Sequence, residues 1–122
     1  MDDAVRQALE VDRNVDITTI GRKSGEARRI EIWHHLVDGA VYLTSLPGKR
    51  SWFANMLANP DMTFHVKESA QRDIPSKAVP ITDSDEKRDI LTRMKAAEAR
   101  MAHMDVDRWV AESPLIRVDF QE

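Results

Sequence analysis

The chain has 122 residues, 42% of them hydrophobic and 32% charged, so it can bury one core and we expect a single domain spanning residues 1–122. Its formal net charge of −3 argues against general nucleic-acid binding. The absence of cysteine excludes disulfides, thiol nucleophiles and thiolate metal sites, and no window resembles a membrane span. We therefore expect a cytoplasmic protein without an integral membrane segment.

The first part of the chain alternates helical and strand patterns. Residues 3–11 carry apolar side chains at helical spacing, which predicts a short amphipathic helix. Residues 15–20 are rich in β-branched side chains, and residues 28–37 alternate in polarity, so both are predicted strands. The pair Asp38-Gly39 predicts a tight hairpin turn into a further strand at residues 40–45.

The middle of the chain continues this pattern. Ser51 is positioned to cap a helix that runs to about Ala58. Residues 62–66 alternate and predict another strand. Residues 74–81 contain two prolines, which predicts an edge strand or a bent strand, because proline cannot donate to a ladder.

The last third contains a predicted helix at residues 83–103, a short helix at 105–111 and a final strand at 115–120. The total is about six strands and three or four helices. Consecutive strands are joined by tight turns, which favours an antiparallel sheet or small barrel with helices at its edges, an α+β fold that is mainly β. A doubly wound parallel sheet does not fit.

The most distinctive segment is a basic loop framed by Gly21 and Gly25. Glycines permit positive φ angles and let backbone N–H groups turn toward a ligand. Arg22, Lys23 and Arg28 could converge on an anion, most obviously a phosphate. Taken alone, the same pattern also fits a hairpin loop with solvated charges.

A second basic segment, residues 45–52, joins a predicted strand to a predicted helix. A helix N-terminus attracts anions, and Lys49 and Arg50 add positive charge there. An ordinary capped helix is the alternative. If the flanking strands are neighbours, the two basic loops lie at related ends of the sheet.

Several other side chains are candidates for ligand contacts. Trp33 and Trp52 could flank a planar ring, or pack in the core. Asn55 could hydrogen-bond a ligand or fix a neighbouring loop. His34 and His35 are adjacent in a strand and point to opposite faces, so they cannot easily share a metal ion, and we expect no metal site.

Three blocks of sequence together resemble the deazaflavin-dependent nitroreductase family. They are the Thr-Thr-Ile-Gly-Arg-Lys-Ser-Gly segment of residues 18–25, the Asp38-Gly39 hairpin and the Trp-Phe-Ala-Asn-Met-Leu-Ala-Asn-Pro segment of residues 52–60. The resemblance implies a split β-barrel, related to flavin-binding pyridoxamine-phosphate oxidases, that uses coenzyme F420. It also implies that Arg22, Lys23 and Arg28 hold the coenzyme phosphate, that Ser24 and Gly25 shape the loop, and that Trp33, Ser45, Gly48, Trp52 and Asn55 line the coenzyme groove.

The resemblance leads to a functional hypothesis. We expect hydride transfer from the reduced deazaflavin to a small organic acceptor such as an enone, a quinone or a nitro compound. His34, His35 or Glu31 could help to deliver the accompanying proton, and none is assigned as catalytic. An FMN-binding protein of the same fold and a non-enzymatic deazaflavin carrier are the alternatives. By analogy with other small split barrels, a homodimer is expected.

Departures from the family pattern bear on the substrate. The segment rich in tyrosine that contacts nitroimidazole substrates in some family members has no counterpart, because Tyr42 is the only tyrosine in the chain. Nitro-drug reduction is therefore not implied, and the acceptor stays open.

Overall fold

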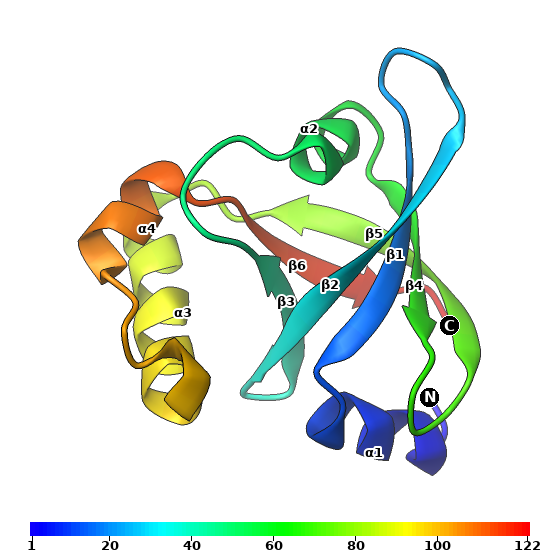
Figure 1. Ribbon diagram of the computed structural model, residues 1–122, viewed down its shortest axis with the longest axis horizontal. Coiled ribbons are helices and arrows are strands. Elements are labelled where there is room, and N and C mark those ends of the chain that lie inside the picture. The colour runs from blue at the N-terminus through cyan, green and yellow to red at the C-terminus, as the bar shows by residue number, and fades with distance from the viewer.

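The computed structural model describes residues 1–122 and contains six strands that close into one antiparallel barrel, in the order β1-β2-β3-β6-β5-β4 (Figure 1). The strands are β1 (Asn14–Ile20), β2 (Ala27–Val37), β3 (Ala40–Thr44), β4 (Asp61–Val66), β5 (Arg72–Pro80) and β6 (Leu115–Phe120). The helices are α1 (Asp3–Val11), α2 (Ser51–Ala58), α3 (Ser84–Ala97) and α4 (Val106–Glu112), with a 3₁₀ turn at Ala99–Met101. The predicted small barrel with helices at its edges is confirmed.

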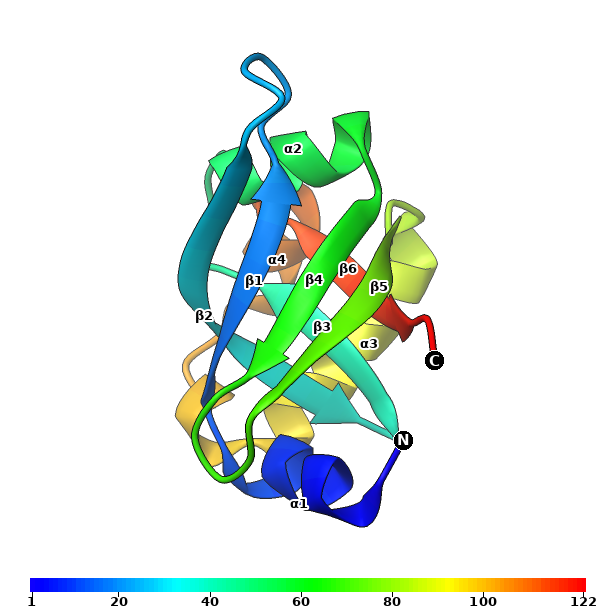
Figure 2. The ribbon, with the colours of Figure 1, turned by 90° about the vertical axis from the view of Figure 1, so that its right-hand side faces the viewer.

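The helices cover the barrel at three places. Helix α1 lies at one end, and α2 lies at the opposite end beside the loop that joins β1 to β2 (Figure 2). Helices α3 and α4 pack against each other on the outside of the barrel, with α3 against β2 (Figure 1). The loop predicted to bind an anion therefore projects from the end of the barrel that carries α2.

Strand pairing follows from residue chemistry. Val15, Ile17 and Thr19 alternate with less buried residues, so one face of β1 points into the barrel. The ladder between β1 and β2 runs up to the pair Ile20 and Ala27, which places the intervening loop at a hairpin end. Asp38 and Gly39 both have positive φ angles, 49° and 82°, as the predicted hairpin turn requires.

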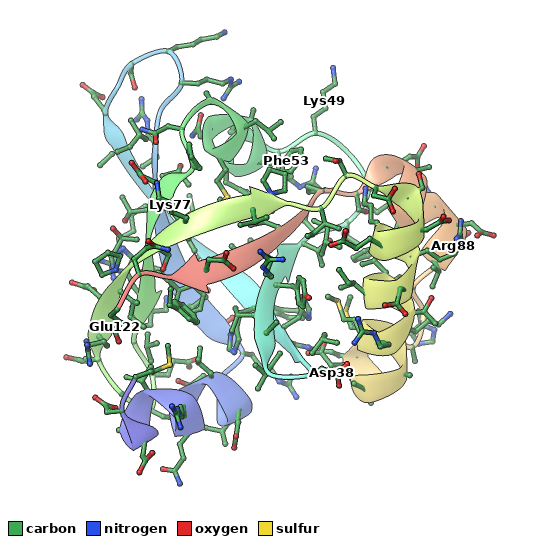
Figure 3. All side chains as sticks on the ribbon, turned by 180° about the vertical axis from the view of Figure 1, so that it is seen from behind. Asp38, Lys49, Phe53, Lys77, Arg88 and Glu122 are labelled. Atoms are coloured by element: carbon green, nitrogen blue, oxygen red, sulfur yellow. The ribbon has the colours of Figure 1, made fainter.

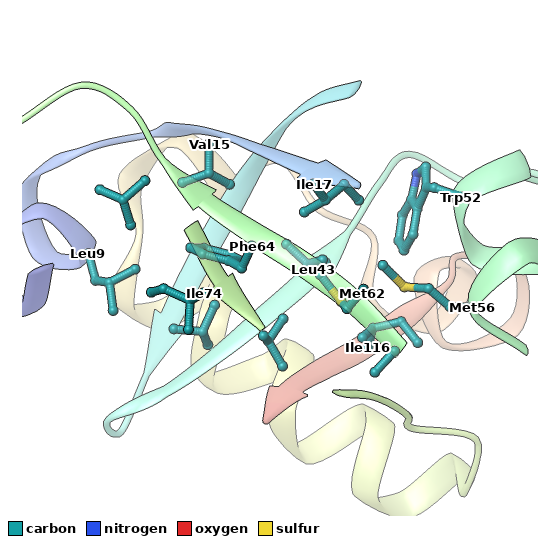
Figure 4. Packing of buried hydrophobic residues seen from close by; sticks show 14 of the residues in the cluster. Leu9, Val15, Ile17, Leu43, Trp52, Met56, Met62, Phe64, Ile74 and Ile116 are labelled. Atoms are coloured by element: carbon teal, nitrogen blue, oxygen red, sulfur yellow. The ribbon is translucent and has the colours of Figure 1, made fainter. Parts of the chain in front are cut away.

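Two apolar clusters stabilise the structure. The first fills the barrel and extends under α1 and α2 (Figure 4), with Val15, Ile17, Leu43, Phe64, Ile74 and Ile116 at its centre. The second lies between the outer face of the barrel and the pair α3 and α4, and includes Tyr42, Ile90, Leu91, Met94, Met101, Met104 and Trp109. Met94, Met101 and Met104 are therefore core residues.

Three of the helices begin at an aspartate whose side chain accepts a backbone N–H. Asp2 caps α1, Asp83 caps α3 and Asp105 caps α4. The prediction that Ser51 caps α2 is wrong. Arg50 occupies the cap position without a side-chain hydrogen bond, and Ser51 is the first helical residue.

Two other local predictions also need correction. Residues 74–81 do not form an edge strand, because β5 pairs with β4 on one side and β6 on the other. Its prolines fit because Pro75 lies just beyond the ladder with β6 and Pro80 lies at that ladder's other end. The helix predicted at 83–103 ends at Ala97, where Glu98 turns into the extended conformation.

Candidate functional site

A cavity of about 420 Å³, here called the loop cavity, opens between the β1–β2 loop and the start of α2. Six residues predicted from the sequence line it, namely Arg22, Lys23, Ser24, Arg28, Trp52 and Asn55. The same cavity is lined by Thr19, Gly21, Ile30 and Ser51. The structure thus brings together residues that are more than 25 positions apart in the sequence.

The backbone of the loop is held by its own hydrogen bonds. Gly21 donates its N–H to the carbonyl oxygen of Glu26 at 2.8 Å, and its own carbonyl oxygen accepts from Gly25 at 2.8 Å. Gly25 has a φ of 72°, as expected for a glycine at a tight turn. Gly21 does not have a positive φ, contrary to expectation. A Cβ there would lie 2.5 Å from Ser24 Oγ, so the Ser24 side chain would have to rotate away, and 3.3 Å from the carbonyl oxygen of Glu26.

Asn55 ties this loop to helix α2. Its Oδ1 accepts from the backbone N–H of Arg22 at 3.1 Å and from Arg22 Nη1 at 3.0 Å. Its Nδ2 donates to Thr19 Oγ1 at 3.2 Å. Of the two roles considered for Asn55, the structure supports that of fixing a neighbouring loop, because both ends of its amide are engaged by the protein.

The positive charges at the loop cavity are weakly neutralised. Arg22 and Lys23 form no ion pair, and Arg28 lies 3.7 Å from the exposed carboxylate of Glu26. Arg29 differs, because its Nε donates to Asp16 Oδ2 at 2.9 Å on the other face of β2. Three of the four basic residues of this segment therefore remain available to an anion at the loop cavity.

The second basic segment does not add its charges to the first. Arg50 donates to the carbonyl oxygens of Leu46 and Lys49 and so stabilises its own loop. Lys49 and Gly48 line a different cavity of about 640 Å³, next to α4. Figure 3 shows Lys49 extending from the chain with α2 between it and the β1–β2 loop. Both segments lie near α2, but their charges do not converge.

A third cavity, of about 380 Å³, is here called the tryptophan cavity. It contains the predicted residues Trp33 and Ser45. Apolar side chains dominate its wall, namely Ile32, Leu46, Met101, Met104 and Trp109. Trp33 and Trp52 therefore line different cavities and do not flank one shared ring. Ile30 lines the loop cavity and Ile32 lines the tryptophan cavity from the same face of β2, whereas Trp33 and His35 line the tryptophan cavity from the opposite face.

A buried polar group faces the tryptophan cavity. His35 is 2% exposed, and its Nδ1 lies 2.6 Å from Glu98 Oε2. Burial raises the pKa of the Glu98 carboxyl, but hydrogen bonding to His35 and the charge of Arg100 outweigh burial, so the pKa lies below its ordinary value. Arg100 also places its guanidinium carbon 4.7 Å from the centre of the Trp33 ring.

Sequence reasoning missed part of this constellation. Thr19 was not singled out, although it lies two residues before Gly21 on the inward face of β1. Glu98 and Arg100 were also missed, and no local signal identifies them, because they lie more than 60 positions from His35 in the sequence.

Comparison with known protein families identifies the family of the chain. The model of the F420H(2)-dependent quinone reductase family matches residues 4–118. The chain belongs to this family. The F420H(2)-dependent quinone reductases are oxidoreductases, and the cofactor of this family is coenzyme F420. No match was found among curated protein sequences.

Solved structures show the same fold as this quinone reductase family member. Protein Rv2991 of Mycobacterium tuberculosis has a TM-score of 0.75 at 16% identity, covering 100% of this chain and 82% of its own. A protein described as an F420 reductase has a TM-score of 0.72 at 15% identity, covering 100% and 97%. A candidate pyridoxamine 5′-phosphate oxidase from Listeria innocua has a TM-score of 0.70 at 14% identity, covering 98% and 93%. The predicted split barrel is thus confirmed.

Membership of the quinone reductase family implies that the residues of the two cavities should suit coenzyme F420. Coenzyme F420 carries a phosphodiester and a polyglutamate tail, so its site needs uncompensated positive charge and an apolar place for a planar ring. The loop cavity offers the first and the tryptophan cavity the second. The residues present therefore fit the group. None of the helices is long and apolar enough to cross a bilayer.

Proposed function

We propose that the protein transfers a hydride from reduced coenzyme F420 to a small organic acceptor, with a quinone as the first candidate and enones and nitro compounds as others. The observation that carries the proposal is the cluster of Arg22, Lys23 and Arg28 around the loop cavity of an otherwise acidic protein. Such charges attract a multiply charged anionic coenzyme and orient its charged end.

In this proposal, the basic loop holds the coenzyme phosphate. Arg22 and Arg28 supply planar guanidinium donors, and Lys23 supplies a point charge. Ser24 and Gly25 shape the loop, and Asn55 keeps it against α2. Because the loop is ordered by these bonds before any ligand binds, little conformational entropy is lost on binding.

The ring end of the coenzyme would occupy the tryptophan cavity. Its wall is mainly apolar, and Trp33 and Ser45 are among its lining residues. Gly48, in the segment that joins β3 to α2, and Trp52, in the first turn of α2, would then support the groove. The bound reduced deazaflavin supplies the hydride, while the chain's own residues bind, orient and exclude water.

A binding titration tests the proposal. Purified protein is titrated with F420 and with FMN, followed by fluorescence and calorimetry. We expect tighter binding of F420, and turnover of reduced F420 with quinones. No binding of F420 would overturn the proposal. Tighter FMN binding would favour the FMN-binding alternative, and F420 binding without turnover on quinones, enones and nitroaromatics would favour a carrier.

Neighbouring arginines on opposite faces of β2 provide a matched control. Lys23→Ala and Arg28→Ala should each weaken F420 binding by about 1–3 kcal/mol, roughly 5- to 150-fold, the size of a charged hydrogen bond. Arg29→Ala should leave the affinity unchanged, because Arg29 pairs with Asp16 away from the cavity. Equal effects of Arg28→Ala and Arg29→Ala would show that only net charge matters.

A further inference from the structure

The structure separates the three side chains that the sequence offers as proton donors. Glu31 is exposed and pairs with Lys67 on the outside of the barrel. The ring of His34 faces α1, where its Nε2 donates to the carbonyl oxygen of Leu9 at 2.7 Å. Burial lowers the pKa of His34, so its imidazole is neutral at neutral pH. Neither group lines the tryptophan cavity, whereas His35 does.

The surroundings of His35 suit proton donation. Its Nδ1–H donates to the Glu98 carboxylate, which fixes the orientation of the ring. Its other nitrogen, Nε2, makes no hydrogen bond within the protein and is not fully buried, and His35 lines the tryptophan cavity. A histidine held by a carboxylate at one nitrogen and open to a cavity at the other can donate a proton from the second.

The charged groups around His35 come from every element packed against it. Glu98 and Arg100 lie on the segment that follows α3, His34 precedes it on β2, and Tyr42 is its partner on β3. Arg100 Nη2 donates to the carbonyl oxygen of His34 at 2.9 Å and lies 3.4 Å from Glu98 Oε1. His103 lines the same cavity. Glu98 is therefore the one carboxylate bonded to the His35 ring.

We propose that His35 is the catalytic proton donor of the reaction and that Glu98 is the positioning residue that holds its ring. This inference rests on the proposed function. A quinone acceptor gains two electrons and one hydrogen as the hydride from the reduced deazaflavin, and one proton from Nε2–H of His35. The N–H bond breaks as an O–H bond forms, the imidazolium becomes neutral imidazole, and solvent returns the proton. The sum is quinone plus hydride plus proton giving hydroquinone.

The test compares His35→Gln with His34→Gln, two adjacent and equally buried histidines. Coenzyme affinity is measured by F420 fluorescence, and turnover with a small 1,4-naphthoquinone is followed from pH 5 to 9. We expect His35→Gln to bind F420 within about twofold of the wild type and to lose about 100-fold or more in kcat. His34→Gln should keep the wild-type kcat.

The pH profile distinguishes a proton donor from a structural residue. The wild type should lose kcat toward alkaline pH with the slope of one proton, and His35→Gln should show no such decline. Glu98→Gln should move the decline to lower pH, and Glu98→Asp should restore part of the wild-type profile. Added imidazole should partly rescue His35→Ala, which a purely structural role of His35 would not allow.

Two outcomes distinguish an error in the assignment of His35 from an error in the proposed function. If the wild type turns over and His35→Gln keeps a kcat within threefold and the same alkaline decline, this assignment is wrong and the proposed function stands. If the wild type neither binds F420 nor oxidises its reduced form, the proposed function fails and this assignment with it. The wild-type pH profile alone overturns the assignment if kcat stays flat to pH 9, even should His35→Gln not fold.

Discussion

Replacing Asn55 separates the stability of the basic loop from its charge. Asn55→Ala removes three hydrogen bonds, two from Arg22 and one to Thr19. The exposed Arg22 groups can bond water instead, but Thr19 is 2% exposed and its hydroxyl would remain buried without a partner. Leaving a buried polar group unpaired costs about 1–3 kcal/mol, so with the lost side-chain packing we expect about 2–4 kcal/mol.

Asn55→Asp is the matched control. Its carboxylate oxygens can still accept from Arg22 and from the hydroxyl of Thr19, so the loss of stability should stay below about 1 kcal/mol. It also places a negative charge at the loop cavity, which opposes an anionic coenzyme. We expect F420 affinity to fall about tenfold or more, the effect of about 1.4 kcal/mol of added repulsion.

Urea unfolding and F420 titration should rank the two variants in opposite orders for stability and for affinity. Asn55→Ala should be unstable, with an affinity loss of roughly 2- to 10-fold from the lost ordering of Arg22. Asn55→Asp should be stable, with the larger affinity loss. If Asn55→Ala is as stable as the wild type, the hydrogen bonds to Arg22 and Thr19 do not hold the loop.

Other variants probe the core, the turn and the buried histidine. Because Phe64 is fully buried, Phe64→Ala should lower the free energy of unfolding, measured in urea, by about 3–5 kcal/mol, and Phe64→Leu should lower it much less. A similar loss of stability for both variants would contradict close packing around Phe64. Because Gly25 has a φ of 72°, Gly25→Ala should lower the stability measured by thermal unfolding by about 1–2 kcal/mol, and Gly25→Asn should lower it less. Equal stability of Gly25→Ala and the wild type would argue against a left-handed turn at Gly25. Burial lowers the pKa of His34 in the folded protein below its ordinary value of 6.5. As the pH falls below about 6.5, His34 therefore binds a proton in the unfolded chain before it does so in the folded protein. The free energy of unfolding should then fall as the pH drops from about 7 to 5. His34→Gln should flatten that fall, and an unchanged slope would assign it to other groups.

Local pattern predicted most of the elements because the signals that mark them are local. The hairpin at Asp38-Gly39 and the strands around it follow from alternation and turn chemistry. Closure of the barrel does not, because β3 pairs with β6 across about 70 positions and no local signal specifies that partner. The prolines of β5 were interpreted as a sign of an edge strand or a bent strand for the same reason, since their fit depends on where the ladder with β6 ends.

The candidate site divides in the same way. Arg22, Lys23 and Arg28 gather because they lie on one hairpin, so the sequence alone brings them together. The sequence could not show that Lys49 lies away from the basic loop, because the position of α2 between them is a feature of the tertiary structure. The partnership of His35 with Glu98 depends on how the chain after α3 meets β2, which is a property of tertiary packing.

The two apolar clusters described above give the molecule a modular construction. The tryptophan cavity lies at their boundary, with Ile32 from the barrel on one wall and Met101, Met104 and Trp109 from the helical cluster on the other. The basic loop belongs to the barrel side alone. Substitutions among the helical residues can therefore reshape the apolar cavity proposed for the coenzyme ring, while the basic loop keeps its geometry. In an evolutionary sense, the two parts of the proposed coenzyme site, the apolar cavity and the basic loop, can change independently of each other.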